Sequence, residues 1–166
     1  MKKQIIMLFA ALSLGSAALS AQTVNAVEEG KYDIKVGDIT MTVNAAQGGK
    51  IVSYRLGDKE VLSQTRFPNS FGSTFWTSPQ SEWNWPPVAE YDRKAFKAEV
   101  NGNVLVLTGE KSERFGYRVR KEFTTDAKNN SISIHNFTSF FILNKNFQII
   151  YYLNQIQKNI IFLLLT

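Results

Sequence analysis

Apolar and polar residues alternate in short runs through the middle of the chain, with a period of two residues. The run 39–43 reads Ile-Thr-Met-Thr-Val, and the run 117–123 reads Tyr-Arg-Val-Arg-Lys-Glu-Phe. Such alternation is typical of β-strands that bury one face. No helical periodicity is sustained over three turns, so we expect an all-β fold. The same pattern predicts further strands at 50–56, 60–62, 95–100, 104–107 and 131–134.

Glycine-containing motifs separate these runs. Gly48-Gly49 precedes the strand at 50–56, and Asn101-Gly102 lies between two later runs. Asn-Gly favours two-residue hairpins because it accepts positive φ. Antiparallel strands with one apolar face need a second sheet to cover that face. We therefore expect an antiparallel β-sandwich with one small core at 22–136.

The first residues have the three-part order of a secretory signal peptide. Lys2 and Lys3 precede the apolar run 5–14, which leads into small residues ending at Ala21. This order predicts a signal peptide at 1–21 and export to the periplasm or the extracellular space. The apolar run is too short for a spanning helix, which needs about 20 apolar residues. We expect no stable membrane span once the signal peptide is removed.

The segment 137–166 differs in composition from the rest of the chain. It contains no Gly, Ala, Val, Asp or Glu, the residues whose codons begin with G. Asn, Ile, Phe, Leu, Lys, Gln and Tyr replace them, as in translated AT-rich sequence. Our hypothesis is a frameshift or a read into unrelated sequence near Asn136, so that 137–166 is not part of the native fold. A membrane anchor is the alternative, but polar residues interrupt the apolar run often.

All three tryptophans and three of the four prolines lie in the segment 75–87. Proline removes backbone donors, so this segment should be a structured loop and not a strand. Indole faces pack well on the C–H faces of sugars, and polar side chains supply hydrogen bonds to hydroxyl groups. Alternatively, the rings cap the hydrophobic core. The predicted saccharide-binding residues are Trp76, Gln80, Glu82, Trp83, Asn84 and Trp85.

Two segments resemble a known family. The stretch 48–54, Gly-Gly-Lys-Ile-Val-Ser-Tyr, followed by Gly-Asp-Lys-Glu-Val-Leu at 57–62, resembles the opening strands of the galactose mutarotase-like fold of aldose 1-epimerases. The Trp-rich segment 69–87 resembles a group of exported Bacteroidetes proteins that share a domain of unknown function. The resemblance covers 32–134. It implies part of a galactose mutarotase-like supersandwich and part of a sugar-binding cleft.

The resemblance does not extend to the catalytic residues. In the epimerases a catalytic histidine and a catalytic glutamate lie on later strands, and this chain leaves the pattern before them. His135 is the only histidine, and it does not match the catalytic position. No carboxylate can be matched to Glu82 as an acid–base partner. We therefore expect no catalytic residue in this fragment.

Composition and charge argue against several classes of function. The net charge of +5 is scattered. The densest basic segment, 114–121, lies between Glu113 and Glu122, alternates like a strand and is interpreted as a solvated strand face. We therefore expect no nucleic-acid partner. With no cysteine and one histidine, neither a disulfide, a metal site, a cofactor nor a nucleophilic triad is predicted.

The preferred function is that of an exported carbohydrate-binding domain, a non-catalytic fragment of a mutarotase-like protein whose partner is a mono- or oligosaccharide. Two alternatives remain open. The first alternative is that the full-length protein is an aldose epimerase or another carbohydrate-active enzyme. The second is that the domain is a structural or protein-interaction module of the cell envelope.

Overall fold

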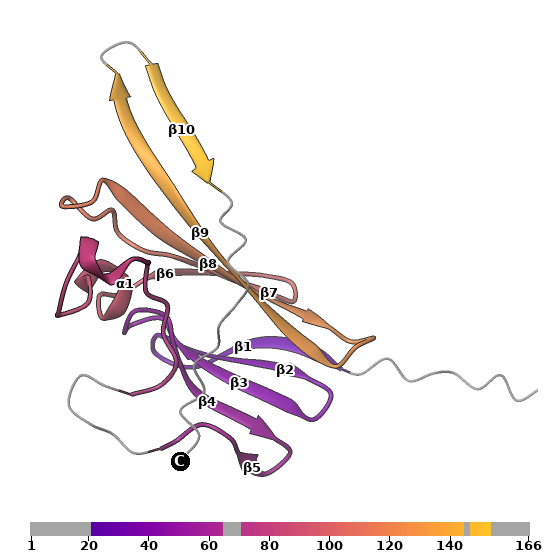
Figure 1. The fold of residues 1–166 in the computed structure, drawn as a ribbon. Coiled ribbons are helices and arrows are strands. Elements are labelled where there is room, and N and C mark those ends of the chain that lie inside the picture. The colour runs from indigo at the N-terminus through magenta and orange to yellow at the C-terminus, as the bar shows by residue number, and fades with distance from the viewer. Residues whose placement is uncertain (1–20, 65–70, 145–146, 154–166) are drawn as a thin grey trace, which may run out of the picture.

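A computed structural model of the chain describes residues 21–64, 71–144 and 147–153. The predicted signal peptide lies outside these residues except for Ala21. Two antiparallel sheets dominate the fold (Figure 1). The first contains, in spatial order, β1 (Gln22–Glu28), β2 (Lys31–Val36), β3 (Ile39–Asn44), β4 (Lys50–Leu56) and β5 (Lys59–Glu60). The second contains β10 (Phe147–Leu153), β9 (Ser131–Asn144), β8 (Tyr117–Asp126), β7 (Val104–Thr108) and β6 (Lys97–Asn101).

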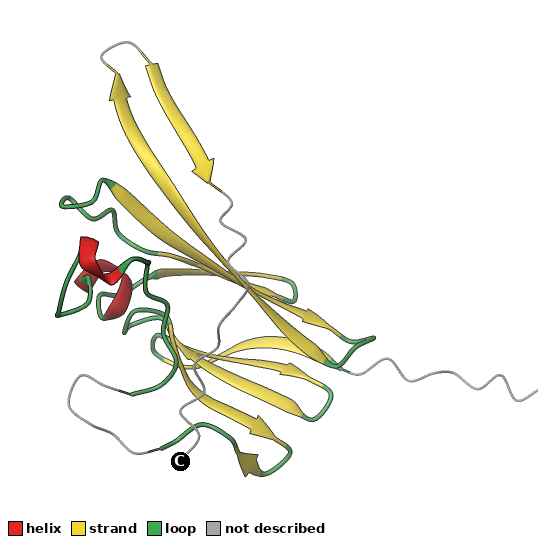
Figure 2. Ribbon diagram, in the orientation of Figure 1, coloured by secondary structure: helices red, strands yellow, loops and turns green. Residues whose placement is uncertain are grey.

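Helices are few and short in the part of the chain that the structure describes. A 3-10 helix, η1 (Gln80–Glu82), and one turn of α-helix, α1 (Ala89–Asp92), lie in the connection between the two sheets (Figure 2). Each sheet is a simple meander in which neighbours in sequence are neighbours in space. The expected all-β, sandwich-like architecture is confirmed.

The inward faces of the two sheets form one hydrophobic core. The alternation read from the sequence is visible in the burial of β8, where every second residue from Tyr117 to Phe123 is buried. This is the period of two that a strand imposes on its side chains. The buried apolar residues of the core include Val24, Ile34, Met41, Val43, Leu105, Leu107, Val119 and Phe123.

The sequence pattern did not identify β1 and β2. In β1 only Val24 is buried, and the residues from Asn25 to Glu28 are exposed, so an edge strand of this kind carries little apolar signal. In β2 the alternation is present, with Ile34 and Val36 fully buried. That pattern could have been found by the criterion applied to the other strands.

The hairpin between β6 and β7 turns one residue later than predicted. Asn101 pairs with Val104, so the two-residue turn is Gly102-Asn103 and not Asn101-Gly102. Gly102 has a φ of +59°, which glycine adopts without the steric cost that a side chain incurs. The Asn101-Gly102 dipeptide therefore predicted the hairpin correctly but placed its turn one residue too early.

The Gly48-Gly49 turn makes a direct contact with the second sheet. Both glycines have positive φ, and a Cβ on Gly48 would lie 2.1 Å from the backbone oxygen of Asp92. The Lys121 Nζ on β8 donates hydrogen bonds to the carbonyl oxygens of Gly48 at 2.7 Å and Gly49 at 3.2 Å. The glycine pair, whose sequence is compatible with a bulge or a tight turn, forms a tight turn before β4. It brings the backbones of the two sheets close enough for one lysine to bridge them.

Lys121 is 2% exposed, so the interpretation of 114–121 as a solvated face is wrong for this residue. Strand alternation places it on the inward face between Val119 and Phe123. Burial lowers the pKa of Lys121 to about 7; the carboxylate of Asp92 opposes this shift and the charge of Lys50 adds to it. The inter-sheet space thus contains a small charged cluster.

Strand β9 continues past the predicted boundary at residue 136. It pairs with β8 from Asp126↔Ser131 to Tyr117↔Phe140 without a register shift. Beyond this pairing, the hairpin of β9 and β10 extends away from the rest of the sandwich (Figure 1). The proposed change of reading frame near Asn136 therefore does not coincide with the end of a strand. The origin of 137–166 stays a prediction.

The pKa of Lys121 predicts how stability depends on pH. The group titrates at about 7 in the folded chain and near 10.5 when unperturbed. Between these values the unfolded chain binds more protons than the folded chain, so the free energy of unfolding rises with pH. We expect a rise of roughly 2–4 kcal/mol between about pH 7 and about pH 9.5. Urea unfolding at a series of pH values measures it.

The matched variants are Lys121→Met and Lys35→Met. Lys121→Met should lose the rise with pH, whereas Lys35, which is exposed on β2, should have no part in it. Equal slopes in the natural chain and in Lys121→Met would contradict the assignment.

Candidate functional site

The Trp-rich segment is a loop between β5 and β6, as predicted. From residue 71 onward, where the structure describes it, the segment contains η1 and no strand of the two sheets. Near its start, Ser73 exchanges backbone hydrogen bonds with Ile51 of β4, at 2.9 and 2.8 Å. The Ser78-Pro79 and Trp85-Pro86 peptide bonds are cis. The loop is thus fixed to the first sheet at its start and continues into α1 at its end.

Trp76 is attached to the charged cluster between the sheets. Its indole Nε1 donates a hydrogen bond of 3.0 Å to Asp92 Oδ1. The same oxygen lies 3.4 Å from Lys50 Nζ, in an ion pair whose side chains are both less than a tenth exposed. Charge-assisted hydrogen bonds of this kind are stronger than neutral ones. Trp76 is therefore held by its nitrogen while its ring remains 44% exposed.

Trp83 is buried, with 5% of its surface exposed. Its Nε1 donates to the Thr77 carbonyl oxygen at 2.9 Å. The Tyr117 hydroxyl of β8 donates to Thr77 Oγ1 at 3.2 Å. The expectation that this indole is presented to solvent is wrong, because its nitrogen and ring are both used within the fold. Trp83 forms the base on which the exposed rings rest.

Trp85 is the most exposed of the three indoles, at 65%. The Trp76 ring lies between the other two, with centroid distances of 5.9 Å to both Trp83 and Trp85. The interplanar angles of 64° and 82° are those of edge-to-face contacts. We call these three residues the aromatic platform. Exposure increases along the platform from the buried Trp83, through Trp76, to Trp85, which is mostly in solvent.

The predicted polar residues Gln80, Glu82 and Asn84 are all exposed, on and just after η1. The Gln80 carbonyl oxygen accepts backbone hydrogen bonds from Trp83 at 3.2 Å and Asn84 at 2.8 Å. Asn84 has a φ of +56°, a conformation that asparagine tolerates better than most residues. The presence of asparagine at position 84 is therefore explained by its backbone conformation, without a contact to a ligand.

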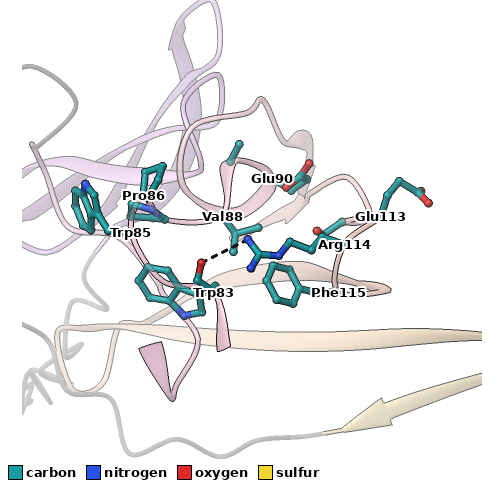
Figure 3. Close-up of a pocket in the computed structure, with 11 residues that line it drawn as sticks. Trp83, Trp85, Pro86, Val88, Glu90, Glu113, Arg114 and Phe115 are labelled. Atoms are coloured by element: carbon teal, nitrogen blue, oxygen red, sulfur yellow. Dashed lines mark hydrogen bonds between the residues drawn. The ribbon is translucent and has the colours of Figure 1, made fainter. Parts of the chain in front are cut away.

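An open cavity of about 440 Å³ lies beside the platform, between the end of the Trp-rich loop and the loop before β8 (Figure 3). Two of the predicted residues, Trp83 and Trp85, line it. Its lining residues do not include Trp76, Gln80, Glu82 or Asn84. The full lining is Trp83, Trp85, Pro86, Pro87, Val88, Ala89, Glu90, Ser112, Glu113, Arg114 and Phe115.

Arg114 is the principal residue of this cavity that the sequence pattern missed. Its guanidinium carbon lies 4.8 Å from the centroid of the Phe115 ring. Its Nη1 donates a long hydrogen bond of 3.5 Å to the Trp83 carbonyl oxygen (Figure 3). The sequence placed Arg114 with the strand residues that follow, whereas it lies in the loop before β8. The adjacent Arg-Phe pair, a common stacking arrangement, was the available signal.

Both glutamates of the cavity have lysine partners. Glu90 Oε1 lies 3.1 Å from Lys94 Nζ, one turn further along. Glu113 Oε2 lies 3.9 Å from Lys111 Nζ. The hydrogen bonds that Lys94 donates to the carboxylates of Glu110 and Glu90 raise the pKa of Lys94. The carboxylates are thus partly neutralised by cations on the same rim.

Helix α1, which forms one wall of the cavity, packs against β8 through Tyr91. Tyr91 is 1% exposed and stacks on Tyr117, with 5.1 Å between ring centroids. The Tyr91 hydroxyl donates to the Tyr117 carbonyl oxygen at 3.0 Å. Burial raises the pKa of this phenol, so it remains a hydrogen-bond donor. The wall that carries Glu90 is therefore well supported.

His135 lies in the middle of β9, exposed, opposite Glu122 of β8. In the described residues no group of three or more His, Cys, Asp or Glu side chains is arranged to hold a metal ion. The helices within the described ranges include none that is long and apolar enough to cross a membrane.

Comparisons with protein-family models, with curated proteins and with solved structures find no match to this chain. The galactose mutarotase-like assignment therefore depends on the sequence motifs alone and stays a prediction.

Substitution of each cavity tryptophan by alanine should show that the buried Trp83 stabilises the fold and that the exposed Trp85 contributes little to stability. Trp83→Ala removes a buried ring and leaves the Thr77 carbonyl without its donor, so the free energy of unfolding should fall by about 3–5 kcal/mol. Trp85→Ala should lower it by less than about 1 kcal/mol. Urea unfolding measures both. A Trp83→Ala variant as stable as the natural chain would contradict the burial of this ring.

Proposed function

We propose that this protein is an exported carbohydrate-binding domain whose ligand packs on the aromatic platform and enters the adjacent cavity. One observation carries the proposal: two indoles of a connected aromatic cluster, Trp76 and Trp85, remain substantially exposed beside a cavity of about 440 Å³. Exposed aromatic clusters of this kind are typical of ligand- or partner-binding surfaces. The cavity volume lies in the range of small-ligand sites, about 300–1,000 Å³.

Saccharides suit this surface because they combine flat C–H faces with many hydroxyl groups. Trp85 offers the apolar face, and its two side-chain torsions cost little entropy to immobilise. The platform is already ordered through the Trp76–Asp92 and Trp83–Thr77 hydrogen bonds. A site that is ordered before binding loses less free energy on association.

Polar groups around the cavity complement the hydroxyl groups of a sugar. The carboxylates of Glu90 and Glu113 accept hydrogen bonds, and the guanidinium of Arg114 donates them. This arrangement supports a binding function without assigning an acid–base pair. Residues on η1 extend the polar surface toward a second sugar unit of an oligosaccharide.

Two other functions predict different results in simple assays. An aldose epimerase would accelerate the mutarotation of a fresh sugar anomer, measured by polarimetry. An envelope interaction module would retain protein partners in a pull-down and no glycan on an array.

Substitution of Trp85 is the direct test of the proposal. Trp85→Ala should weaken retention on a glycan array by at least about tenfold, because the packing of a sugar on the indole depends on the lost ring face. Leu56→Ala is the matched control, since Leu56 is also an exposed apolar residue but lies on β4. Unchanged retention in a folded Trp85→Ala variant would overturn the proposal.

The role of Asn84 can be separated from its backbone conformation. Asn84→Gly keeps the left-handed conformation accessible and removes the side chain, whereas Asn84→Ala adds strain of about 1 kcal/mol. If Asn84 contacts the ligand, both variants should weaken glycan retention, and only Asn84→Ala should be less stable. If the Asn84→Gly variant retains glycan like the natural chain, Asn84 is not a ligand contact.

A further inference from the structure

Among the residues that the structure describes, no carboxylate is paired with the charge of Arg114. The two glutamates that line the same cavity are each partnered by a lysine, Glu90 by Lys94 and Glu113 by Lys111. Within the described residues, no salt bridge involves the Arg114 guanidinium. The nearest acceptor recorded for it is the neutral carbonyl oxygen of Trp83, at 3.5 Å. The exposed guanidinium of Arg114 therefore lines the cavity with donors that an anionic ligand can occupy in place of water.

The guanidinium is also held in position before a ligand binds. Phe115 lies under it, with 4.8 Å from the guanidinium carbon to the ring centroid, and the Trp83 carbonyl accepts from Nη1. Figure 3 shows the side chain extending from the loop toward Trp83 and Val88, into the cavity. A guanidinium has five N–H donors, so one bond to a carbonyl leaves most of them available.

We propose that the cavity is selective for an anionic saccharide, whose negatively charged substituent binds to Arg114 while its ring packs against Trp85. This inference rests on the proposed carbohydrate-binding function and names the class of ligand. The planar guanidinium matches a carboxylate with two parallel hydrogen bonds. The same donors bind the oxygens of a sulfate ester, so the shared chemistry is an oxyanion on the sugar.

The acidic residues of the rim do not cancel this preference. Glu90 is bridged by Lys94, whose Nζ also lies 3.1 Å from Glu110. Glu113 has a side chain that is 89% exposed, so solvent and salt screen its charge. Arg114 is also exposed, but its guanidinium lies over the Phe115 ring and reaches the Trp83 carbonyl oxygen, so it is the charge that lies against the aromatic walls of the cavity. The preference of the cavity for an anionic or a neutral sugar is therefore set by Arg114 and not by Glu90 and Glu113.

The test compares binding of the folded chain to matched pairs of polysaccharides. Polygalacturonate carries free, charged carboxylates, which are esterified and neutral in its methyl ester. A sulfated galactan and the same galactan after desulfation differ in the charged sulfate ester. Affinity electrophoresis should show tighter binding to the charged member of one pair or both. Arg114→Gln should weaken binding of that charged member by about 10- to 100-fold and change binding of its neutral partner by less than about threefold.

Arg114→Lys serves as the conservative variant. It keeps the charge but loses the planar pair of donors, so it should recover part of the affinity for a sulfate ester and less of that for a carboxylate. Binding that falls with added salt in the natural chain, and does so less steeply in Arg114→Gln, is a further supporting result.

Each other outcome overturns the inference. Equal binding of both members of each pair would show no selectivity for charge and would leave the proposed function standing. Equal loss of charged and neutral ligands in Arg114→Gln would assign Arg114 to the integrity of the platform, which urea unfolding of that variant would show as lost stability. No binding to any of the four polysaccharides would overturn both the inference and the proposed function.

Discussion

The structure depends on the buried charged cluster that Lys121, Asp92 and Lys50 form between the sheets. Lys121 of β8 binds the carbonyl oxygens of the Gly48-Gly49 turn, and Asp92 of α1 pairs with Lys50 of β4. Apolar burial is non-directional and allows two sheets to slide, whereas these contacts have defined geometry. Removing Asp92 or Lys50 would leave the charge of the other buried without its partner, which is costly. The cluster therefore sets how the two sheets meet.

The same cluster determines where the aromatic platform stands. Asp92 accepts the indole hydrogen bond of Trp76, so the carboxylate that pairs with Lys50 also orients the first ring of the platform. Trp83 is connected through Thr77 to the Tyr117 hydroxyl on β8. The loop is thus attached to both sheets, and Trp85 is supported by rings that cannot easily move. An exposed indole on a rigid base is well suited to recognition.

The cavity combines residues that no local sequence motif brings together. Trp83 and Trp85 come from the loop between the sheets, whereas Arg114 and Phe115 come from the loop before β8. The pairing of Glu90 with Lys94 and of Glu113 with Lys111 leaves Arg114 as the cation that faces the cavity. The proposed ligand class follows from this arrangement of charges and not from the tryptophans, because an indole ring would pack on neutral and charged sugars alike.

The sequence by itself determined the strands from β3 to β8, the first residues of β9, the turn at Gly48-Gly49 and the loop character of the Trp-rich segment. Period-two alternation, glycine and proline act locally, so short windows of sequence report them. The tertiary structure decided which indole is buried, that Lys121 faces inward against carbonyl oxygens, and that Arg114 joins the platform. These outcomes depend on the distance between residues far apart in sequence, because burial and charge pairing are properties of the packed sheets and not of any one strand.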